Sequence, residues 1–151
     1  MSGQAEGFYA KGMEAFKNGN TLGALAFFER AFNLEPENPT YQSFLGICIA
    51  RERGKIAEAI NLCEKAVQSE PRKIESYLNL GRVYLNAGFR SKSVEVFRNG
   101  LMIDNKNPEI IAELQALGLR KKPVFQVLSR NHILNKYLGI ILSRLGFRGN
   151  K

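Results

Sequence analysis

Side chains with the potential for catalysis are few and widely spaced in this chain of 151 residues. His132 is the only histidine, so the sequence supplies neither a histidine cluster for a metal ion nor a Ser/His/Asp triad. Glu35 and Glu37 flank Pro36 in a predicted turn, where both carboxylates are expected to be solvated rather than paired for acid–base chemistry. No phosphate-binding loop of the G-x-x-x-x-G-K-[ST] type occurs. We therefore predict a protein that is not an enzyme and that uses no metal or cofactor.

The two cysteines, Cys48 and Cys63, fall inside helical patterns and form no C-x-x-C pair. This placement is typical of buried thiols in a reducing compartment. The first residues lack the basic segment and apolar run of a secretory signal, and no stretch has the roughly 20 apolar residues that span a bilayer. These features predict a cytoplasmic location.

Positive charge is concentrated toward the C-terminus. Residues 106–151 contain 9 Lys and Arg against only Glu109 and Glu113, whereas residues 1–105 contain 13 basic and 12 acidic residues. Such asymmetry indicates an extension that could bind an acidic partner, RNA or an anionic membrane surface. Because its basic residues are scattered and few aromatic rings are available for base stacking, nucleic acid is not the favoured partner.

Small and aromatic residues recur at similar spacing in three consecutive units. The recurring residues are Phe8, Gly12, Ala15, Gly19, Ala24, Phe28, Ala31 and Pro36, then Leu45, Gly46, Gly54, Ala59, Cys63, Ala66 and Pro71, then Tyr77, Leu80, Gly81, Tyr84, Gly88, Ser93, Phe97 and Gly100. Each unit predicts two packed helices, because helices approach closely only where side chains are small. We expect Gly12, Gly46 and Gly81 of the first helices to face Ala24, Ala59 and Ser93 of the second helices.

Residues that end helices separate these predicted pairs. Gly19, Gly54 and Gly88 are expected to form left-handed turns within the three units. Pro36 and Pro71 end the second helix of their units, because proline cannot continue a helix.

The segments 80–84 (LGRVY) and 59–66 (AINLCEKA) resemble the two helices of the tetratricopeptide repeat family, and the resemblance covers about residues 5–119. Pro36 and Pro71 lie about 35 residues apart, against about 34 for that family's period. The resemblance implies an all-α fold, a right-handed superhelix of helical hairpins. The expected parts are repeats at about 5–38, 39–73 and 74–107, then a capping helix at 108–118 that Asn107 and Pro108 open.

The resemblance also implies a concave groove lined by outward positions of each repeat's first helix. These positions are Glu6, Tyr9, Met13 and Lys17, then Ser43, Ile47 and Arg51, then Leu78, Arg82, Leu85 and Asn86. The set is largely apolar and includes three cations. It would suit an apolar or amphipathic segment of a partner protein that carries some negative charge.

Co-chaperone members of the family hold a C-terminal carboxylate with Lys, Asn and Arg at set positions of these helices. The corresponding positions here are Tyr9, Met13, Phe44, Glu75 and Asn79. None of these side chains is cationic, and Glu75 would repel a carboxylate. We therefore predict that this chain has no carboxylate clamp.

Residues 120–151 do not follow the repeat and predict a helix at about 132–145. Its apolar side chains include Ile133, Leu134, Tyr137, Leu138, Ile141 and Leu145, spread over roughly 200° of the helix. The helix could cap the last repeat, mediate self-association or dock in a neighbour's groove, or adsorb to an anionic membrane surface, with capping favoured. The extension also resembles that of some bacterial repeat proteins, which implies a bacterial source.

These observations predict a protein–protein interaction module, an adaptor or scaffold that binds a partner peptide or helix in the groove. Two alternatives stay open. The chain could be a small chaperone for apolar secreted or membrane proteins, or a peripheral binder of membranes or polyanions through its basic extension.

Overall fold

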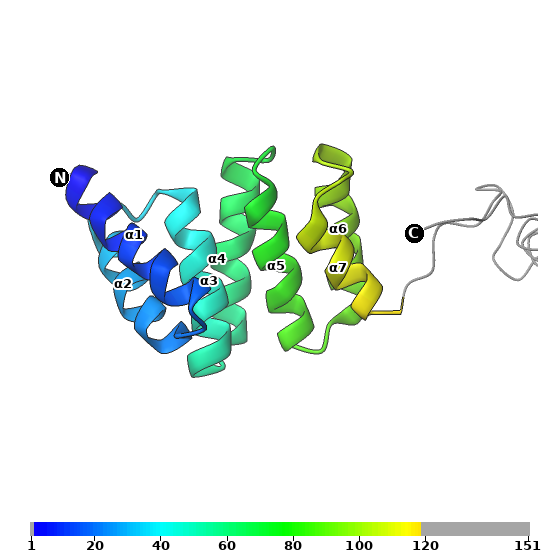
Figure 1. Ribbon diagram of the computed structural model, residues 1–151, viewed down its shortest axis with the longest axis horizontal. Coiled ribbons are helices and arrows are strands. Elements are labelled where there is room, and N and C mark those ends of the chain that lie inside the picture. Colours follow the sequence, from blue (N-terminus) through cyan, green and yellow to red (C-terminus); the bar gives the residue numbers. More distant parts are fainter. Residues whose placement is uncertain (1, 119–151) are drawn as a thin grey trace, which may run out of the picture. The chain divides into compact units, whose positions relative to one another are not determined.

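A computed structural model describes residues 2–118, and this part of the chain contains seven α-helices and no strand (Figure 1). The helices are α1 Ser2–Lys17, α2 Thr21–Leu34, α3 Pro39–Arg53, α4 Ile56–Ser69, α5 Ile74–Asn86, α6 Arg90–Ile103 and α7 Pro108–Ala116. The predicted all-α class is confirmed. The helix expected at 132–145 lies outside the described residues.

Consecutive helices pair as three hairpins, α1 with α2, α3 with α4 and α5 with α6. Further packing of α2 on α3, and of both α3 and α4 on α5, joins each hairpin to the next. Figure 1 shows the hairpins side by side in chain order, with α7 following α6. Such a stack buries apolar faces that no single hairpin could cover alone.

The turn inside each hairpin depends on a glycine with a left-handed backbone. Gly19, Gly54 and Gly88 have φ angles of 78°, 63° and 78°, a region in which a side chain would be strained. This confirms the turns predicted from the repeat.

Asparagine side chains begin several of the helices. The Oδ1 atoms of Asn20, Asn38 and Asn107 accept hydrogen bonds from backbone N–H groups of α2, α3 and α7 at 2.9, 3.0 and 3.0 Å. Pro39 and Pro108 follow directly as the first residues of α3 and α7, where proline's missing N–H leaves no intrahelical bond unmade.

Glycines in the first helices make room for side chains of the second helices. A Cβ atom on Gly12 would lie 2.6 Å from the Phe28 ring, and one on Gly81 would overlap the Phe97 ring. In these two hairpins the ring of the second helix fills the space that the glycine leaves.

The middle hairpin follows the prediction. A Cβ atom on Gly46 would lie 2.9 Å from the carbonyl oxygen of Ala59 and 2.6 Å from Sγ of Cys63. The close contact in this hairpin is therefore between one helix backbone and the other.

The centre of the core is α3, whose residues 41–50 are all buried. Its Phe44 ring lies 5.5 Å from that of Phe28 and 5.8 Å from each of those of Phe16 and Tyr9, measured between centroids. Helices α2, α4 and α5 all pack against α3. The first helix of the middle hairpin is consequently enclosed by neighbouring helices on most sides.

Candidate functional site

The predicted groove residues divide into an interior set and a surface set. Ser43 and Ile47 are each 1% exposed and Leu78 is 6% exposed. Tyr9, Met13, Arg82 and Leu85 are half-buried, whereas Glu6, Lys17, Arg51 and Asn86 are exposed. A ligand could reach Ser43, Ile47 and Leu78 only by displacing the helices that cover them.

Hydrogen bonds between α3 and α5 account for part of this burial. Asn79 Nδ2 donates to Ser43 Oγ at 3.0 Å, and Asn86 Nδ2 donates to the Ala50 carbonyl at 3.0 Å. These polar groups connect α3 with α5, the first helices of two neighbouring repeats. They form inter-repeat contacts rather than an open binding surface.

Two of the three predicted groove cations are also engaged within the fold. The Arg82 guanidinium donates to Glu113 Oε1 at 2.6 Å and to Glu109 Oε2 at 3.2 Å, both in α7. The Arg51 guanidinium lies 5.5 Å from the centroid of the Phe16 ring. The charge of Arg82 is therefore compensated within the fold, whereas Lys17 and Arg51 remain exposed.

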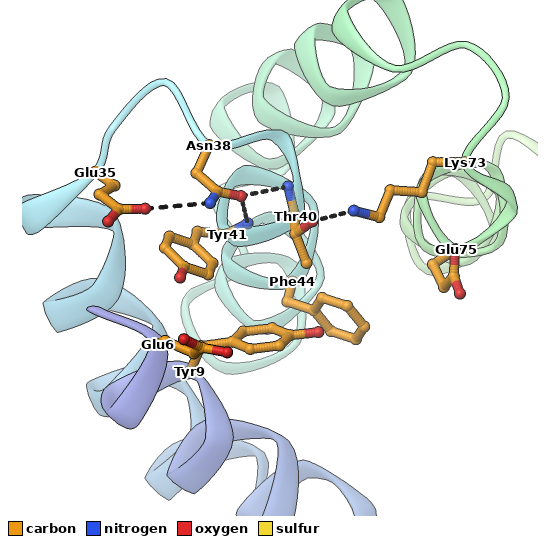
Figure 2. A pocket seen from close by; sticks show the side chains of 9 residues that line it. All are labelled: Glu6, Tyr9, Glu35, Asn38, Thr40, Tyr41, Phe44, Lys73 and Glu75. Carbon is orange, nitrogen blue, oxygen red and sulfur yellow. Dashed lines mark hydrogen bonds between the residues drawn. The ribbon is translucent and has the colours of Figure 1, made fainter. Parts of the chain in front are cut away.

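A cavity of about 410 Å³ opens at the N-terminal ends of α3 and α5, beside α1 (Figure 2). Two inter-repeat turns complete its walls. The lining residues are Glu6, Tyr9, Glu35, Asn38, Thr40, Tyr41, Phe44, Lys73 and Glu75.

Aromatic rings form the inner wall of this cavity. The Tyr9 ring lies 5.3 Å from that of Tyr41 and 5.8 Å from that of Phe44, the latter edge to face. In the view of Figure 2, Glu6 lies on the left with Tyr9 and Tyr41, Phe44 is in the middle and Glu75 is on the right. The cavity thus combines an aromatic wall with acidic side chains at its edges.

The polar edge of the cavity is partly satisfied by its own contacts. Lys73 Nζ donates to Thr40 Oγ1 and lies 3.0 Å from a carboxylate oxygen of Glu70, which is outside the lining. Asn38 Nδ2 donates to Glu35 at 3.3 Å. Within residues 2–118, Glu6 and Glu75 make neither an ion pair nor a hydrogen bond through their carboxylates.

Two phenol groups of the cavity wall have raised pKa values, through burial and through the nearby carboxylates. Burial first, and then the nearby Glu75 carboxylate, together raise the pKa of Tyr9 to about 12. Burial also raises the pKa of Tyr41, with smaller contributions from Glu35 and Glu6. Ionising either phenol would place another negative charge beside these carboxylates.

Sequence reasoning identified this cavity only in part. It named Glu6 and Tyr9 as groove positions and considered Phe44 and Glu75 only as counterparts of a carboxylate clamp. Glu35, Asn38 and Lys73 belong to inter-repeat turns. The repeat pattern identifies such turns only as links between helices and does not predict that their side chains line a cavity. The spacing of polar residues around Pro36 and Pro71 was the available signal.

Other predictions concern residues or groups beyond this cavity. The predicted contact residues of the C-terminal helix, Ile133, Leu134, Tyr137, Leu138, Ile141 and Leu145, lie outside the described part of the chain. Among residues 2–118, no helix is both long and apolar enough to cross a membrane. Over the same residues, no three His, Cys, Asp or Glu side chains gather as a metal site would require.

Family comparisons identify the repeat. Sequence profiles described as tetratricopeptide repeat match residues 50–117 and 5–38, which together are more than half of the chain. The chain belongs to the tetratricopeptide repeat family.

A longer plant protein contains a similar segment. The TPR repeat-containing thioredoxin TTL4 of Arabidopsis thaliana is 33% identical over 107 residues, which are 71% of this chain and 15% of that protein. This chain therefore spans only a small part of that relative's length. The match is confined to a segment of a much longer protein.

Solved structures share the fold. The Arabidopsis OM64 TPR domain has a TM-score of 0.65 at 21% identity, covering 78% of this chain and 96% of that one. The second TPR domain of human RPAP3, in complex with the HSP70 peptide SGPTIEEVD, has a TM-score of 0.62 at 18% identity, covering 78% and 97%.

Proposed function

We propose that this protein is a non-enzymatic interaction module that binds a segment of a partner protein. The binding surface, called the groove below, comprises the cavity and five surface residues of α1, α3 and α5, which are Tyr9, Met13, Lys17, Arg51 and Leu85. The observation that carries the proposal is this cavity of about 410 Å³, which α1, α3, α5 and two turns line together. A solved domain of the same fold, from human RPAP3, is in complex with a peptide, which supports the class of ligand.

The groove proposed here differs from the sequence-based set. It keeps the side chains that reach the surface, Tyr9, Met13, Lys17, Arg51 and Leu85. It places Ser43, Ile47 and Leu78 behind that surface, as packing that holds it in shape. It adds Phe44 and Glu75 from the cavity wall.

Variants that probe the groove must spare the packing between repeats. Replacing Leu78 would leave a cavity in the core, and replacing Arg82 would remove the ion pairs that hold α7. Lost binding in either variant could then result from disturbed packing instead of a lost contact with the ligand. Thr40 is a better position, because it is half-buried and lines the cavity, and its contact with the next repeat is a hydrogen bond from Lys73 rather than core packing. The Thr40→Trp variant would fill the cavity with an indole ring.

The test is selection from a random dodecapeptide library displayed on phage, using the full chain as bait. We expect peptides that bind the wild-type chain and lose binding to T40W. The matched control is Asn61→Trp, which adds the same ring at an exposed position of α4 outside the cavity. Failure to recover peptides, or equal binding to T40W and N61W, would refute the groove.

A further inference from the structure

We propose that the cavity receives a cationic side chain, so that the groove selects a partner segment with lysine or arginine beside an apolar residue. This inference rests on the proposed function and specifies the chemistry of the ligand at one point in the groove. The sequence alone predicted a partner segment with some negative charge, whereas this site would bind a positively charged side chain.

The acidic groups around the cavity converge from separate parts of the fold. Glu6 comes from α1, Glu35 follows α2, and Glu75 comes from the first turn of α5. All three line the same cavity. Carboxylates on one helix face are usually a solvated surface, whereas carboxylates from three elements around one hollow create a common negative potential.

Among residues 2–118, the lining of the cavity supplies no cation that is free to neutralise these carboxylates. Lys73 is the only basic residue in the lining. Its ammonium already contacts the Glu70 carboxylate and the Thr40 hydroxyl. Glu6 and Glu75 are left without an ion-pair partner among residues 2–118, and they lie on opposite sides of Phe44 in the view of Figure 2.

The aromatic wall favours the same ligand. Tyr9, Tyr41 and Phe44 line the cavity, in which Tyr9 is half-buried while Tyr41 and Phe44 are 6% and 7% exposed. A cation near such rings is attracted by their quadrupoles, and the aliphatic stem of lysine or arginine can pack on them. The same rings and carboxylates together would repel an anion.

Alternative ligands gain less from this arrangement. A wholly apolar side chain would contact the rings but would also take water from the carboxylates without replacing its hydrogen bonds. A carboxylate would meet Glu6 and Glu75 at close range. A positively charged side chain compensates both carboxylates and uses the aromatic surface.

The experiment uses the peptides recovered from the dodecapeptide library and the full chain. We expect lysine or arginine to be enriched at one position of the binders, next to an apolar residue. Changing that residue to glutamine should weaken binding about five- to tenfold, as for two partly exposed ion pairs with aromatic contacts. The double variant E6Q/E75Q should weaken the cationic peptide similarly and leave the glutamine peptide unchanged.

The control variant is E14Q/E95Q, which makes the same change in net charge at exposed positions outside the cavity. It should leave both affinities within twofold of wild type. Binders without basic enrichment, or equal effects of the two double variants, would overturn the cationic site while the groove still stands. Recovery of no peptide at all would overturn the proposed function itself, and this inference with it.

Discussion

Arg82 of α5 and Glu113 of α7 form a 2.6 Å ion pair, and the same guanidinium lies 3.2 Å from Glu109 one turn earlier in α7. The side chains of Arg82 and Glu113 are 22% and 24% exposed. Ile110, which lies between the two glutamates in sequence, is fully buried against Gly100 of α6. Burial of Ile110 and this branched ion pair both hold α7 against the preceding hairpin.

Replacing Arg82 with alanine should loosen α7. Because the ion pair is partly buried, we expect a loss of about 1–2 kcal/mol, between the values for exposed and buried pairs. Urea denaturation measures the loss, and hydrogen exchange should show faster exchange in α7 than in α1. Arg98→Ala, at an exposed position of α6, is the control and should stay within about 0.5 kcal/mol of wild type. Unchanged protection of α7 in R82A would contradict the tether.

Alanine at Gly46 should destabilise the protein, whereas alanine at Gly7 should stabilise it. The added methyl group at Gly46 would press on the Ala59 carbonyl, a backbone atom that cannot rotate away, and we expect a loss of about 1–3 kcal/mol. At Gly7 the methyl group meets nothing within 4 Å, so the gain in helix propensity of about 0.5–1 kcal/mol remains. Thermal unfolding of both variants tests the opposite signs of the two stability changes. A stabilised G46A would show that the hairpin can accommodate the added methyl group.

Stability should fall in alkali partly through Tyr84. Burial, followed by its hydrogen bond to Glu64 at 2.6 Å, raises the pKa of this phenol to about 12 from 10.0. Because the folded-state pKa is above the unfolded one, this contribution is complete below pH 10 and disappears as the pH approaches 12. Urea midpoints measured across that range should fall more steeply for wild type than for Y84F, which cannot ionise there. Parallel slopes would exclude the phenol as the cause.

Both cysteines should be unreactive in the folded protein. Cys48 and Cys63 are fully buried, and burial raises the pKa of the Cys48 thiol to about 12 and that of the Cys63 thiol further. Since the thiolate is the reactive form, Ellman's reagent should label neither thiol near pH 8 in native buffer and both in denaturant. Rapid labelling of the native chain would indicate that the α3–α4 hairpin opens locally.

Local chemistry made most of the fold predictable from the sequence. Gly54 and Gly88 adopt the left-handed turns that their spacing indicated, and Asn107 with Pro108 begins α7 as expected. These features depend on backbone conformations that few residue types tolerate. A pattern that recurs at a regular interval therefore specifies helices and turns without knowledge of distant contacts.

The candidate binding site could be predicted from the sequence only in part, because it depends on which helices cover each face. A helical period states which positions share a face, and it does not state which neighbouring helix covers that face. Ser43 and Leu78 share a face with surface positions yet are buried by the packing of α5 on α3. Arg82 was interpreted as a ligand contact because its α7 partners are 27 and 31 residues away in the chain.

The amino-acid sequence alone therefore determined the helical hairpins, their turns and their membership in a repeat family, because each of these follows from short-range conformational preferences repeated along the chain. Only the tertiary structure decided which faces remain open and what charge they carry. Glu6, Glu35 and Glu75 are far apart in sequence, and stacking of the repeats brings them to one cavity. The electrostatic character of that cavity is a property of packing between repeats, and it cannot be read from any single repeat.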